Sequence, residues 1–417
     1  MISDQEIEVL SAIQTLEMPT RKRLARQVRR STVSISSQLS SLLGRGLVEK
    51  SGKIVGKGGR PSTVYRLSPE VGCTIGVYME DTVCHVVALD ATGAICAERM
   101  MLLSLSGDAA GQTAEIVAQL SEEVAKLMAS ATQDGRRVLA IGIGPQGMVD
   151  SRRGMWLHGF GLAGVEHVNL RSLLEGTLAR AVLVEDPARC LAHLAVSRLG
   201  RAETSDFFLL YLGSGVGAGL VLGGNLYRGN HGMAGEIGHL PVEDPGTRCR
   251  CGNTGCLETV ASVPAILGRF NRRIDEGVIS SLQKYGPQRG AEALTLEAIV
   301  DAAAGGDRLA LSSLADIGAL VGKACATMVM LYNPRTICIA GPAAILFDYL
   351  REHIWNAVRR TVIPEMLADL RLEVMLPRPG DEAVGAAMLA AHWFWERNVS
   401  RDPAALGIHP PARELFS

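Results

Sequence analysis

One histidine and three cysteines lie close together in a glycine-containing stretch of the chain. They are His239, Cys249, Cys251 and Cys256, and they fall within eighteen residues. Thiolates together with one imidazole are the ligands of a closed, four-coordinate zinc site. Two glycines between the last two cysteines allow the backbone to fold tightly around a point. The spacing therefore predicts a structural zinc ion whose four ligands all come from the chain, leaving no open position for catalysis.

Two other interpretations apply to cysteines in general. Cysteine is a common core residue, and we expect burial for the six cysteines that lie singly in apolar or strand-like runs: Cys73, Cys84, Cys96, Cys190, Cys325 and Cys338. Disulfides are disfavoured, because Met1 to Leu16 lacks the basic start and apolar core of a signal peptide. We therefore expect a cytoplasmic protein with reduced thiols.

Two pairs of carboxylates are candidates for contacts with a small polar ligand. Glu236 and Glu258 flank the cysteines, and a metal-bound loop that fixes polar side chains is a suitable wall for a pocket. Glu185 and Asp186 follow a strand-like run and precede a helical one, at the strand end where α/β folds bind ligands. Such carboxylates accept sugar hydroxyls, or one acts as a general base. The alternative for Asp186 is a helix cap.

A glycine-rich segment, Gly213 to Gly219, follows another strand-like run. Its glycines leave backbone amides accessible to an anion or a sugar. The alternative interpretation of this segment is a tight turn between two strands.

Strand-like and helical runs alternate through the body of the chain, which predicts α/β organisation. Strands are expected at 74–77, 83–88, 138–143, 182–184, 207–212, 219–222 and 336–340, and helices at 113–131, 170–178, 187–199 and 314–332. The length of 417 residues predicts two or three domains, and 47% hydrophobic residues suffice for their cores. No run of eighteen apolar residues occurs, so we expect no membrane span.

The first 67 residues have a different charge from the rest. The formal net charge of the chain is −1, yet Glu49 is the only acid between Arg21 and Arg66, an interval with many basic residues: Arg21, Lys22, Arg23, Arg26, Arg29, Arg30, Arg45, Lys50, Lys53, Lys57, Arg60 and Arg66. A basic segment on a mildly acidic body indicates binding to a polyanion.

The same segment has the pattern of a winged helix-turn-helix. Ser3, Thr20 and Ser31 or Thr32 are candidate caps of three helices, the third ending at Gly44. Two strand-like runs, 47–50 and 62–67, flank the basic loop 57–61. In the third helix we expect an apolar side formed by Val33, Leu39, Leu42 and Leu43.

The candidate DNA contacts come from the turn, the third helix and the loop. They are Arg29, Arg30, Thr32, Ser34, Ser36, Ser37, Gln38, Lys57 and Arg60. Short hydroxyl and amide side chains suit base edges and phosphates, and Arg60 in a slim Gly-Arg-Pro loop suits a narrow minor groove. A protein-binding module is the alternative, because the third helix from Thr32 to Leu43 carries no basic residue.

Together these features resemble the ROK family of bacterial sugar-responsive repressors and sugar kinases. The resemblance rests on the Gly-Gly-Arg-Pro loop, Gly235 to His239 with the three cysteines and Glu258, Asn333-Pro334, and the loop from Gly144 to Asp150. It implies an actin-like, hexokinase-like fold with two α/β lobes around a cleft, in a dimer or tetramer. It also implies that Glu236, His239 and Glu258 contact the sugar, and that Asp186 matches the base of the kinases.

The chain departs from the family pattern at three places. Glu185 stands where an asparagine is usual, so a negative charge replaces an amide. The segment 74–80 lacks the glycines and threonine of the kinase phosphate loop, and Tyr78, Met79 and Glu80 would oppose a phosphate. Ala340 to Ala344 lacks the second glycine of the turn near adenosine. The resemblance with these departures predicts a regulator that does not use ATP.

The sequence thus predicts a sugar-responsive transcriptional repressor, with an ATP-dependent sugar kinase as the alternative. A zinc-stabilised protein whose head docks on another protein is a third class. The expected domains are a winged helix-turn-helix at 1–67, a sugar-binding body at 70–395 and a tail at 396–417. The expected partners are operator DNA, a sugar or sugar derivative, and further copies of the chain.

Overall fold

The computed structural model describes residues 3–16, 18–55, 61–105, 109–133, 135–159, 161–162, 165–199, 204–285 and 293–399. The chain forms two compact units. The first combines Met1–Cys190 with Glu382–Ser417, and the second is Leu191–Asp381. Most of the expected tail, 400–417, lies outside the described residues.

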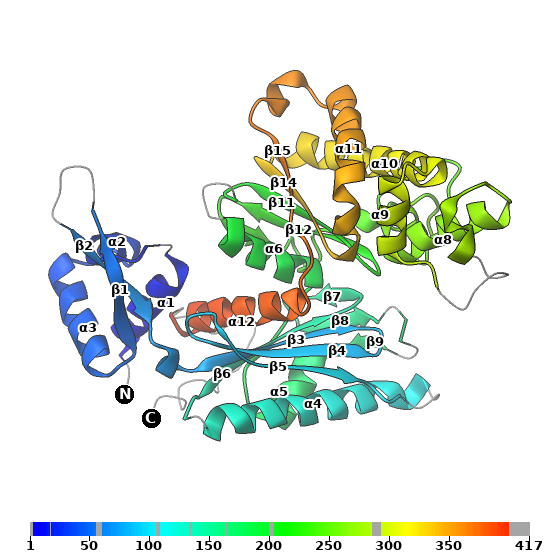
Figure 1. Ribbon diagram of the computed structural model, residues 1–417. Coiled ribbons are helices and arrows are strands. Elements are labelled where there is room, and N and C mark those ends of the chain that lie inside the picture. Colours follow the sequence, from blue (N-terminus) through cyan, green and yellow to red (C-terminus); the bar gives the residue numbers. More distant parts are fainter. Residues whose placement is uncertain are drawn as a thin grey trace. The chain divides into compact units, whose positions relative to one another are not determined.

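The N-terminal part of the first unit is three helices followed by an antiparallel hairpin (Figure 1). The elements are α1 (Asp4–Thr15), α2 (Arg21–Gln27), α3 (Thr32–Gly44), β1 (Val48–Ile54) and β2 (Ser62–Leu67). Ser3 forms a capping box with Glu6, and the side chains of Thr20 and Ser31 accept backbone N–H bonds at the starts of α2 and α3. The expected caps and the helix–helix–helix–hairpin order are confirmed.

The packing of α3 corrects two expectations. Ile35, Leu39 and Leu42 form its buried stripe, whereas Val33 is 78% exposed. Val33 lies in the first turn and outside the i, i+4, i+7 series that faces the core. Gln38 was expected to face outward but is buried, because it lies within that stripe. Its Nε2 donates to Gln5 Oε1 at 2.8 Å.

The rest of the first unit is a five-stranded sheet in the order β10-β6-β3-β4-β5. β3, β4 and β5 are antiparallel neighbours, and β6 runs parallel to both β3 and β10. The strands are β3 (Cys73–Glu80), β4 (Val83–Asp90), β5 (Ile95–Leu102), β6 (Val138–Pro145) and β10 (Val182–Val184). A small sheet of β7 (Met148–Asp150), β8 (Met155–His158) and β9 (Glu166–Val168) and the 3-10 turn η1 (Pro69–Val71) complete it.

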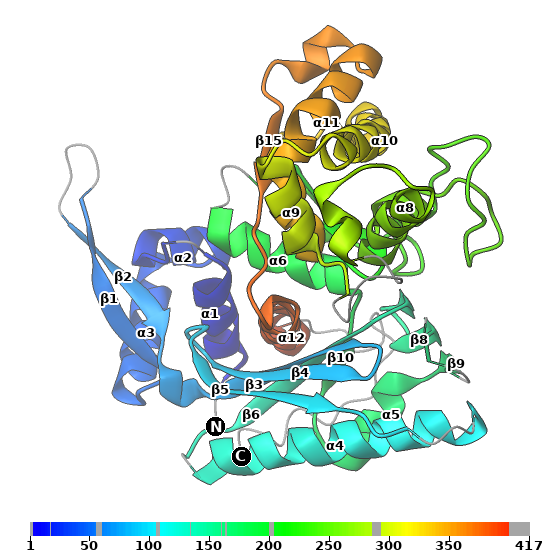
Figure 2. The same ribbon diagram turned by 45° about the vertical axis from the view of Figure 1, so that its right-hand side comes forward.

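Helices cover both faces of this sheet. In Figures 1 and 2, α4 (Ala109–Gln133) and α5 (Leu170–Leu178) lie on one face and α12 (Asp381–Val399) on the other. Glycines allow α12 to approach closely, since a Cβ at Gly76 would collide with Ala383 O and one at Gly142 with Ala386 O. Both lie in strand interiors, where glycine is costly unless another backbone comes this near.

The second unit is a sheet in the order β13-β12-β11-β14-β15, packed against helices around one large core. Its strands are β11 (Phe207–Leu212), β12 (Val216–Leu222), β13 (Asn225–Tyr227), β14 (Thr336–Ala340) and β15 (Arg371–Val374). Its helices are α6 (Pro187–Leu199), which begins in the first unit, then α7 (Glu258–Ala261), α8 (Val263–Asp275), α9 (Leu296–Ala304), α10 (Arg308–Tyr332) and α11 (Phe347–Thr361). The 3-10 turns are η2 (Ile237–His239), η3 (Ser281–Tyr285), η4 (Pro342–Leu346) and η5 (Pro364–Leu367).

Among the described helices, α10 alone is long and apolar enough to cross a membrane. Its most apolar window is 56% buried within the protein. It packs along α11, where Gly318 and Gly322 allow close contact with His353 and Ala357. These contacts are those of a core helix.

Candidate functional site

The expected zinc ligands come together in the second unit. His239 ends η2, and Cys249, Cys251 and Cys256 follow on the loop that leads to α7. One donor atom from each residue lies within 4.8 Å of all the others. Cys251 Sγ is 3.7 Å from Cys256 Sγ, and Cys249 Sγ is 3.7 Å from His239 Nδ1.

These separations fit a tetrahedral zinc site. Bonds of about 2.3 Å to sulfur and about 2.1 Å to nitrogen place two sulfurs about 3.8 Å apart, and sulfur and nitrogen about 3.6 Å apart. Four soft or borderline donors with this spacing are suited to hold a metal ion.

The backbone of the loop is shaped to bring the cysteines together. Cys249 N donates to Asn253 O at 2.7 Å and Gly252 N donates to Cys249 O at 3.0 Å, which closes a tight turn. Gly255 has a φ of 70°, and a Cβ there would collide with Glu243 O. A residue with a side chain is therefore excluded at Gly255.

The thiols differ in their surroundings. Burial raises the pKa of Cys256 to about 12 and also raises the pKa of Cys249. The backbone N–H of Asn253 lowers the pKa of the exposed Cys251. Thiolates bind metals, so an ion here would replace the thiol protons.

His239 lies between the cysteines and Glu236. Its Nδ1 faces Cys249, and its Nε2 is 3.9 Å from Glu236 Oε2. The ring is thus oriented to bind an ion through one nitrogen and to interact with Glu236 or a ligand through the other. The Glu236 side chain is 34% exposed and accessible to a ligand.

Glu258 begins α7 and is held by Arg250, a residue that the sequence analysis missed. Arg250 Nε donates to Glu258 Oε1 at 2.9 Å and Arg250 Nη2 donates to Oε2 at 3.0 Å. Val216 N donates to the same Oε2 at 3.2 Å. The place of Arg250 between two cysteine ligands was the available signal, but its partner is not visible in the sequence.

The glycine-rich segment is shorter as a loop than expected. β12 begins at Val216 rather than at Gly219, so the turn is Gly213 to Gly215, closed by a 2.9 Å bond from Gly213 N to Gly215 O. Gly217 and Gly219 pair with β11 instead. The tight-turn interpretation fits this geometry. A Cβ on Gly215 would lie 3.0 Å from Glu258 Oε2, so the turn also borders this carboxylate.

Glu185 and Asp186 occupy the strand-to-helix junction of the first unit, after β10. Asp186 Oδ1 accepts a 3.2 Å bond from Arg189 N and so caps α6, as the alternative interpretation proposed. Burial raises the pKa of Asp186, although its side chain stays partly exposed. Glu185 Oε1 accepts from Asp186 N at 3.0 Å and from Arg189 Nε at 2.6 Å, and both members of this ion pair are 1% exposed.

The candidate DNA contacts differ in their exposure and in the interactions that they already make within the protein. Thr32 and Ser37 are exposed, and Ser36 Oγ donates to Thr32 O at 2.7 Å. Arg30 is paired with Glu8 at 2.8 Å. Arg29 adopts a left-handed φ of 54° at the α2–α3 turn. The candidates Lys57 and Arg60 lie outside the described residues.

A family model described as the ROK family matches residues 74–393, most of the chain. The chain belongs to the ROK family. The α/β fold with its N-terminal helices is therefore that of the expected actin-like, hexokinase-like class.

Relatives of this ROK protein include a regulator and an enzyme. A "Putative xylose repressor" of Caldicellulosiruptor sp. (strain Rt8B.4) is 28% identical over 355 residues, covering 85% of this chain and 87% of the relative. The crystal structure of a ROK family transcriptional regulator, homologous to the Escherichia coli MLC protein, superposes with a TM-score of 0.78 at 25% identity and covers 95% and 98% of the two chains. A ROK family glucokinase from Streptomyces griseus, solved with glucose and AMPPNP, has a TM-score of 0.63 at 25% identity and covers 76% and 99%.

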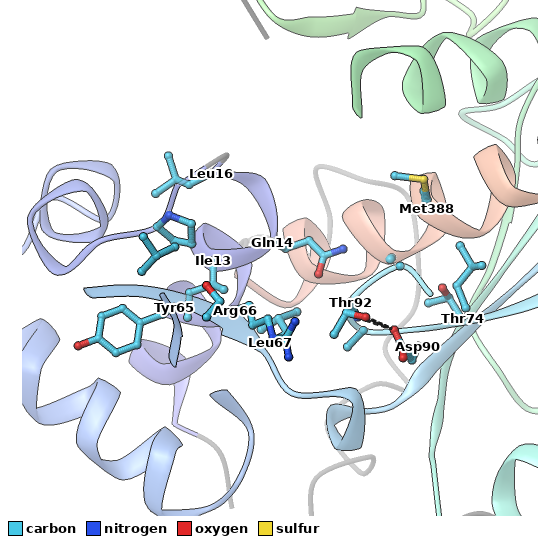
Figure 3. A pocket seen from close by; sticks show the side chains of 17 residues that line it. Ile13, Gln14, Leu16, Tyr65, Arg66, Leu67, Thr74, Asp90, Thr92 and Met388 are labelled. Carbon is cyan, nitrogen blue, oxygen red and sulfur yellow. Dashed lines mark hydrogen bonds between the residues drawn. The ribbon is translucent and has the colours of Figure 1, made fainter. Parts of the chain in front are cut away.

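The first unit of this ROK protein also contains a cavity of about 420 Å³ (Figure 3). Ile13 and Gln14 of α1 and Tyr65 of β2 line it together with the β4–β5 turn and Met388 of α12. α12 therefore packs on the sheet and also lines a cavity that α1 and the hairpin line from the N-terminal side.

Proposed function

We propose that this protein is a zinc-containing transcriptional repressor of carbohydrate-metabolism genes that responds to a sugar or sugar derivative. Its winged helix-turn-helix, residues 1–67, binds operator DNA, and residues 70–395 bind the effector. The proposal rests on the combination of two features. An N-terminal domain of three helices and a hairpin, the pattern of a winged helix-turn-helix, precedes a ROK domain, and carboxylates of the ROK domain lie beside a His-Cys₃ cluster. We place the protein in the cytoplasm as a homodimer or homotetramer.

In the second unit, Glu236, His239 and Glu258 contact the sugar. The support is geometric: Glu236 lies on the side of the imidazole away from Cys249, and Glu258 is joined to the zinc loop through Arg250. A bound zinc ion would fix His239 and its loop, because metal ligands lose their freedom to rotate. The sugar site is thus built on a rigid support.

In the first unit, Asp186 is a further sugar-contacting residue, and Glu185 fixes the junction that presents it. The support is the cap on α6 and the buried pair with Arg189, which hold the carboxylate of Asp186 at the end of β10. Ligands of open α/β sheets bind at such strand ends.

On the DNA side, α3 is the reading helix. Its exposed Thr32 and Ser37 are hydrogen-bonding groups for base edges or phosphates, and the exposed Val33 matches the methyl group of thymine. Arg29 and Arg30 supply phosphate contacts from the preceding turn, with Lys57 and Arg60 on the hairpin loop.

The mechanism is a population shift. A sugar that binds one arrangement of the protein more tightly changes the spacing of the winged helices within the oligomer, and thereby the fit to adjacent half-sites. Such a coupling is typically about 1–3 kcal/mol, equivalent to about 5- to 150-fold in DNA affinity.

Fluorescence anisotropy tests the proposal, on duplex from the chain's own upstream region at a fixed salt concentration. The sugars are D-xylose, D-glucose, other pentoses and hexoses, amino sugars and their phosphates. We expect tight binding that one sugar changes at least tenfold, in line with coupling of about 1–3 kcal/mol. Equal affinity with every sugar would contradict sensing, and no binding at low salt would contradict the DNA claim.

An ATP-dependent sugar kinase remains the second candidate, favoured by Asp186 and by the likeness to the glucokinase. The first lobe opposes it, because Tyr78 and Met79 are buried within β3, where the kinases have a phosphate loop. Ala343 and Ala344, at the turn that lies near adenosine in the kinases, are likewise buried in η4. ATP turnover with the same sugar panel, lost in Asp186→Asn, would favour the kinase.

A further inference from the structure

The carboxylate of Glu258 is nearly saturated with hydrogen-bond donors. A carboxylate offers about four acceptor sites. Arg250 Nε occupies one on Oε1, and Arg250 Nη2 and Val216 N occupy two on Oε2. About one site, on Oε1, is left for a ligand. In this arrangement Glu258 accepts a single hydroxyl.

Arg250 is well placed to impose that restriction. It stands between the ligands Cys249 and Cys251, so its backbone is fixed on both sides by the metal loop. Its two parallel bonds to Glu258 fix the plane of the carboxylate, as in other bidentate arginine pairs. Its side chain is 37% exposed while that of Glu258 is 11% exposed, so Arg250 covers a largely buried carboxylate from the solvent side.

The turn from Gly213 to Gly215 completes the enclosure of this pair. A Cβ on Gly215 would lie 3.0 Å from Glu258 Oε2 and 3.3 Å from Arg250 Nη2. The pair is therefore in contact with the β11–β12 turn, and only a small residue at 215 leaves it undisturbed.

We propose that Arg250 is a positioning and specificity-determining residue of the sugar site, which orients Glu258 and limits it to one hydroxyl of the ligand. This inference rests on the proposed function, because it assigns a role within the same sugar site. It links the metal to the sugar through two steps: the metal fixes the loop, and Arg250 on that loop fixes Glu258.

Three variants of the full-length zinc-loaded protein test this role. Arg250→Met removes every side-chain donor but keeps an unbranched apolar stem, and Arg250→Lys keeps the charge without the bidentate geometry. Arg248→Met is the matched control, because Arg248 is an exposed arginine on the other side of Cys249. Calorimetry measures the affinity for D-xylose and D-glucose and for their monodeoxy analogues, and metal analysis measures zinc per chain.

We expect Arg250→Met to keep its zinc and to bind the preferred sugar about tenfold more weakly. The penalty for removing the one hydroxyl that Glu258 accepts should shrink in this variant, because a reoriented carboxylate no longer selects it. A purely structural defect would instead lower the affinity for all analogues equally. Arg250→Lys should be intermediate, and Arg248→Met should match the wild type.

Two results overturn the assignment. One is an Arg250→Met protein with the affinity and analogue profile of Arg248→Met. The other is loss of zinc in Arg250→Met together with a wild-type profile in Arg250→Lys, which would make Arg250 a part of the loop only. A wild-type protein that binds no sugar would instead overturn the proposed function itself.

Discussion

Two arginine–carboxylate pairs lie at the two candidate ligand-binding regions, and they differ in burial. Glu185 and Arg189, at the start of α6, are each 1% exposed and joined at 2.6 Å. Glu258 and Arg250, beside the cysteine cluster, are 11% and 37% exposed and joined by two bonds. A fully buried pair is costly to separate, whereas a pair with one exposed member, here Arg250, is more open to competition from water or a ligand. The first pair is therefore an anchor, and the second is a contact that a ligand can modulate.

The buried pair also accounts for the charge at position 185. The resemblance led us to expect an amide there, and Arg189 neutralises the charge that Glu185 carries instead. Glu185 lies just before the first residue of α6 and Arg189 lies in its first turn, so the arginine side chain reaches back to the end of β10. The extra charge is thus balanced within the junction itself.

The largest effect is expected from breaking the buried pair. Arg189→Met leaves Glu185 buried without its cation, which costs about 3–5 kcal/mol of the free energy of unfolding. Urea unfolding of the variant and of the double variant Glu185→Gln/Arg189→Met measures this cost. The double variant should recover much of the loss, since neither member of the pair then carries a charge. Equal loss in both variants would mean that packing, and not the charge, makes Arg189 important.

A comparable effect is expected from the metal loop. Cys251→Ala removes one of four ligands, and we expect at least about 100-fold weaker zinc binding, equivalent to about 2.7 kcal/mol, and loss of the sugar response. Cys96→Ala is the control, because Cys96 lies on β5 and, contrary to our expectation of burial, is the other exposed cysteine among the described residues. Metal analysis after dialysis and anisotropy with sugar measure the two losses. A Cys251→Ala protein with normal zinc and a normal response would contradict the role of the cluster.

A smaller effect is expected from disturbing the Arg250–Glu258 pair without changing either member. In Gly215→Ala the new Cβ crowds Glu258 and Arg250, so the pair must shift by a few tenths of an ångström. We expect sugar affinity to fall about fivefold, equivalent to about 1 kcal/mol, with stability almost unchanged. Gly268→Ala in α8 is the control, because a Cβ there meets nothing within 4 Å. Equal sugar affinities of the two variants would place Gly215 outside the site.

Local sequence signals predicted the elements and the His-Cys₃ cluster, because each depends on residues near one another in the chain. The strands at 182–184, 207–212 and 336–340 and the helices at 170–178 and 187–199 match the structure. The His-Cys₃ cluster followed from spacing alone. These features are set by short-range pattern and by ligand chemistry.

Features that depend on partners distant in the sequence could not be predicted. Val33 was assigned to the core by its type, but the register of α3 against α1 and α2 turns it outward. The hydrogen bond from Val216 N to Glu258 Oε2 joins residues 42 positions apart, so no local sequence pattern predicts it. The loop predicted to begin at Gly213 has the correct start, but the prediction extended it to Gly219. Glycine is typical of loops, and only the pairing of Gly217 and Gly219 with β11 identifies them as strand residues.

The smallest effect concerns salt, and it compares the two pairs directly. Double-mutant cycles on Arg250–Glu258 should give a coupling of about 0.2–1 kcal/mol that falls as sodium chloride rises from about 0.05 to about 0.5 M, because the exposed charge of Arg250 is screened. The same cycle on Arg189–Glu185 should give a larger coupling with little salt dependence, because salt ions do not reach a pair that is 1% exposed. Urea midpoints of the single and double variants at both salt concentrations provide the couplings. If the couplings of the two pairs responded equally to salt, the difference in burial would not explain why we assign them different roles.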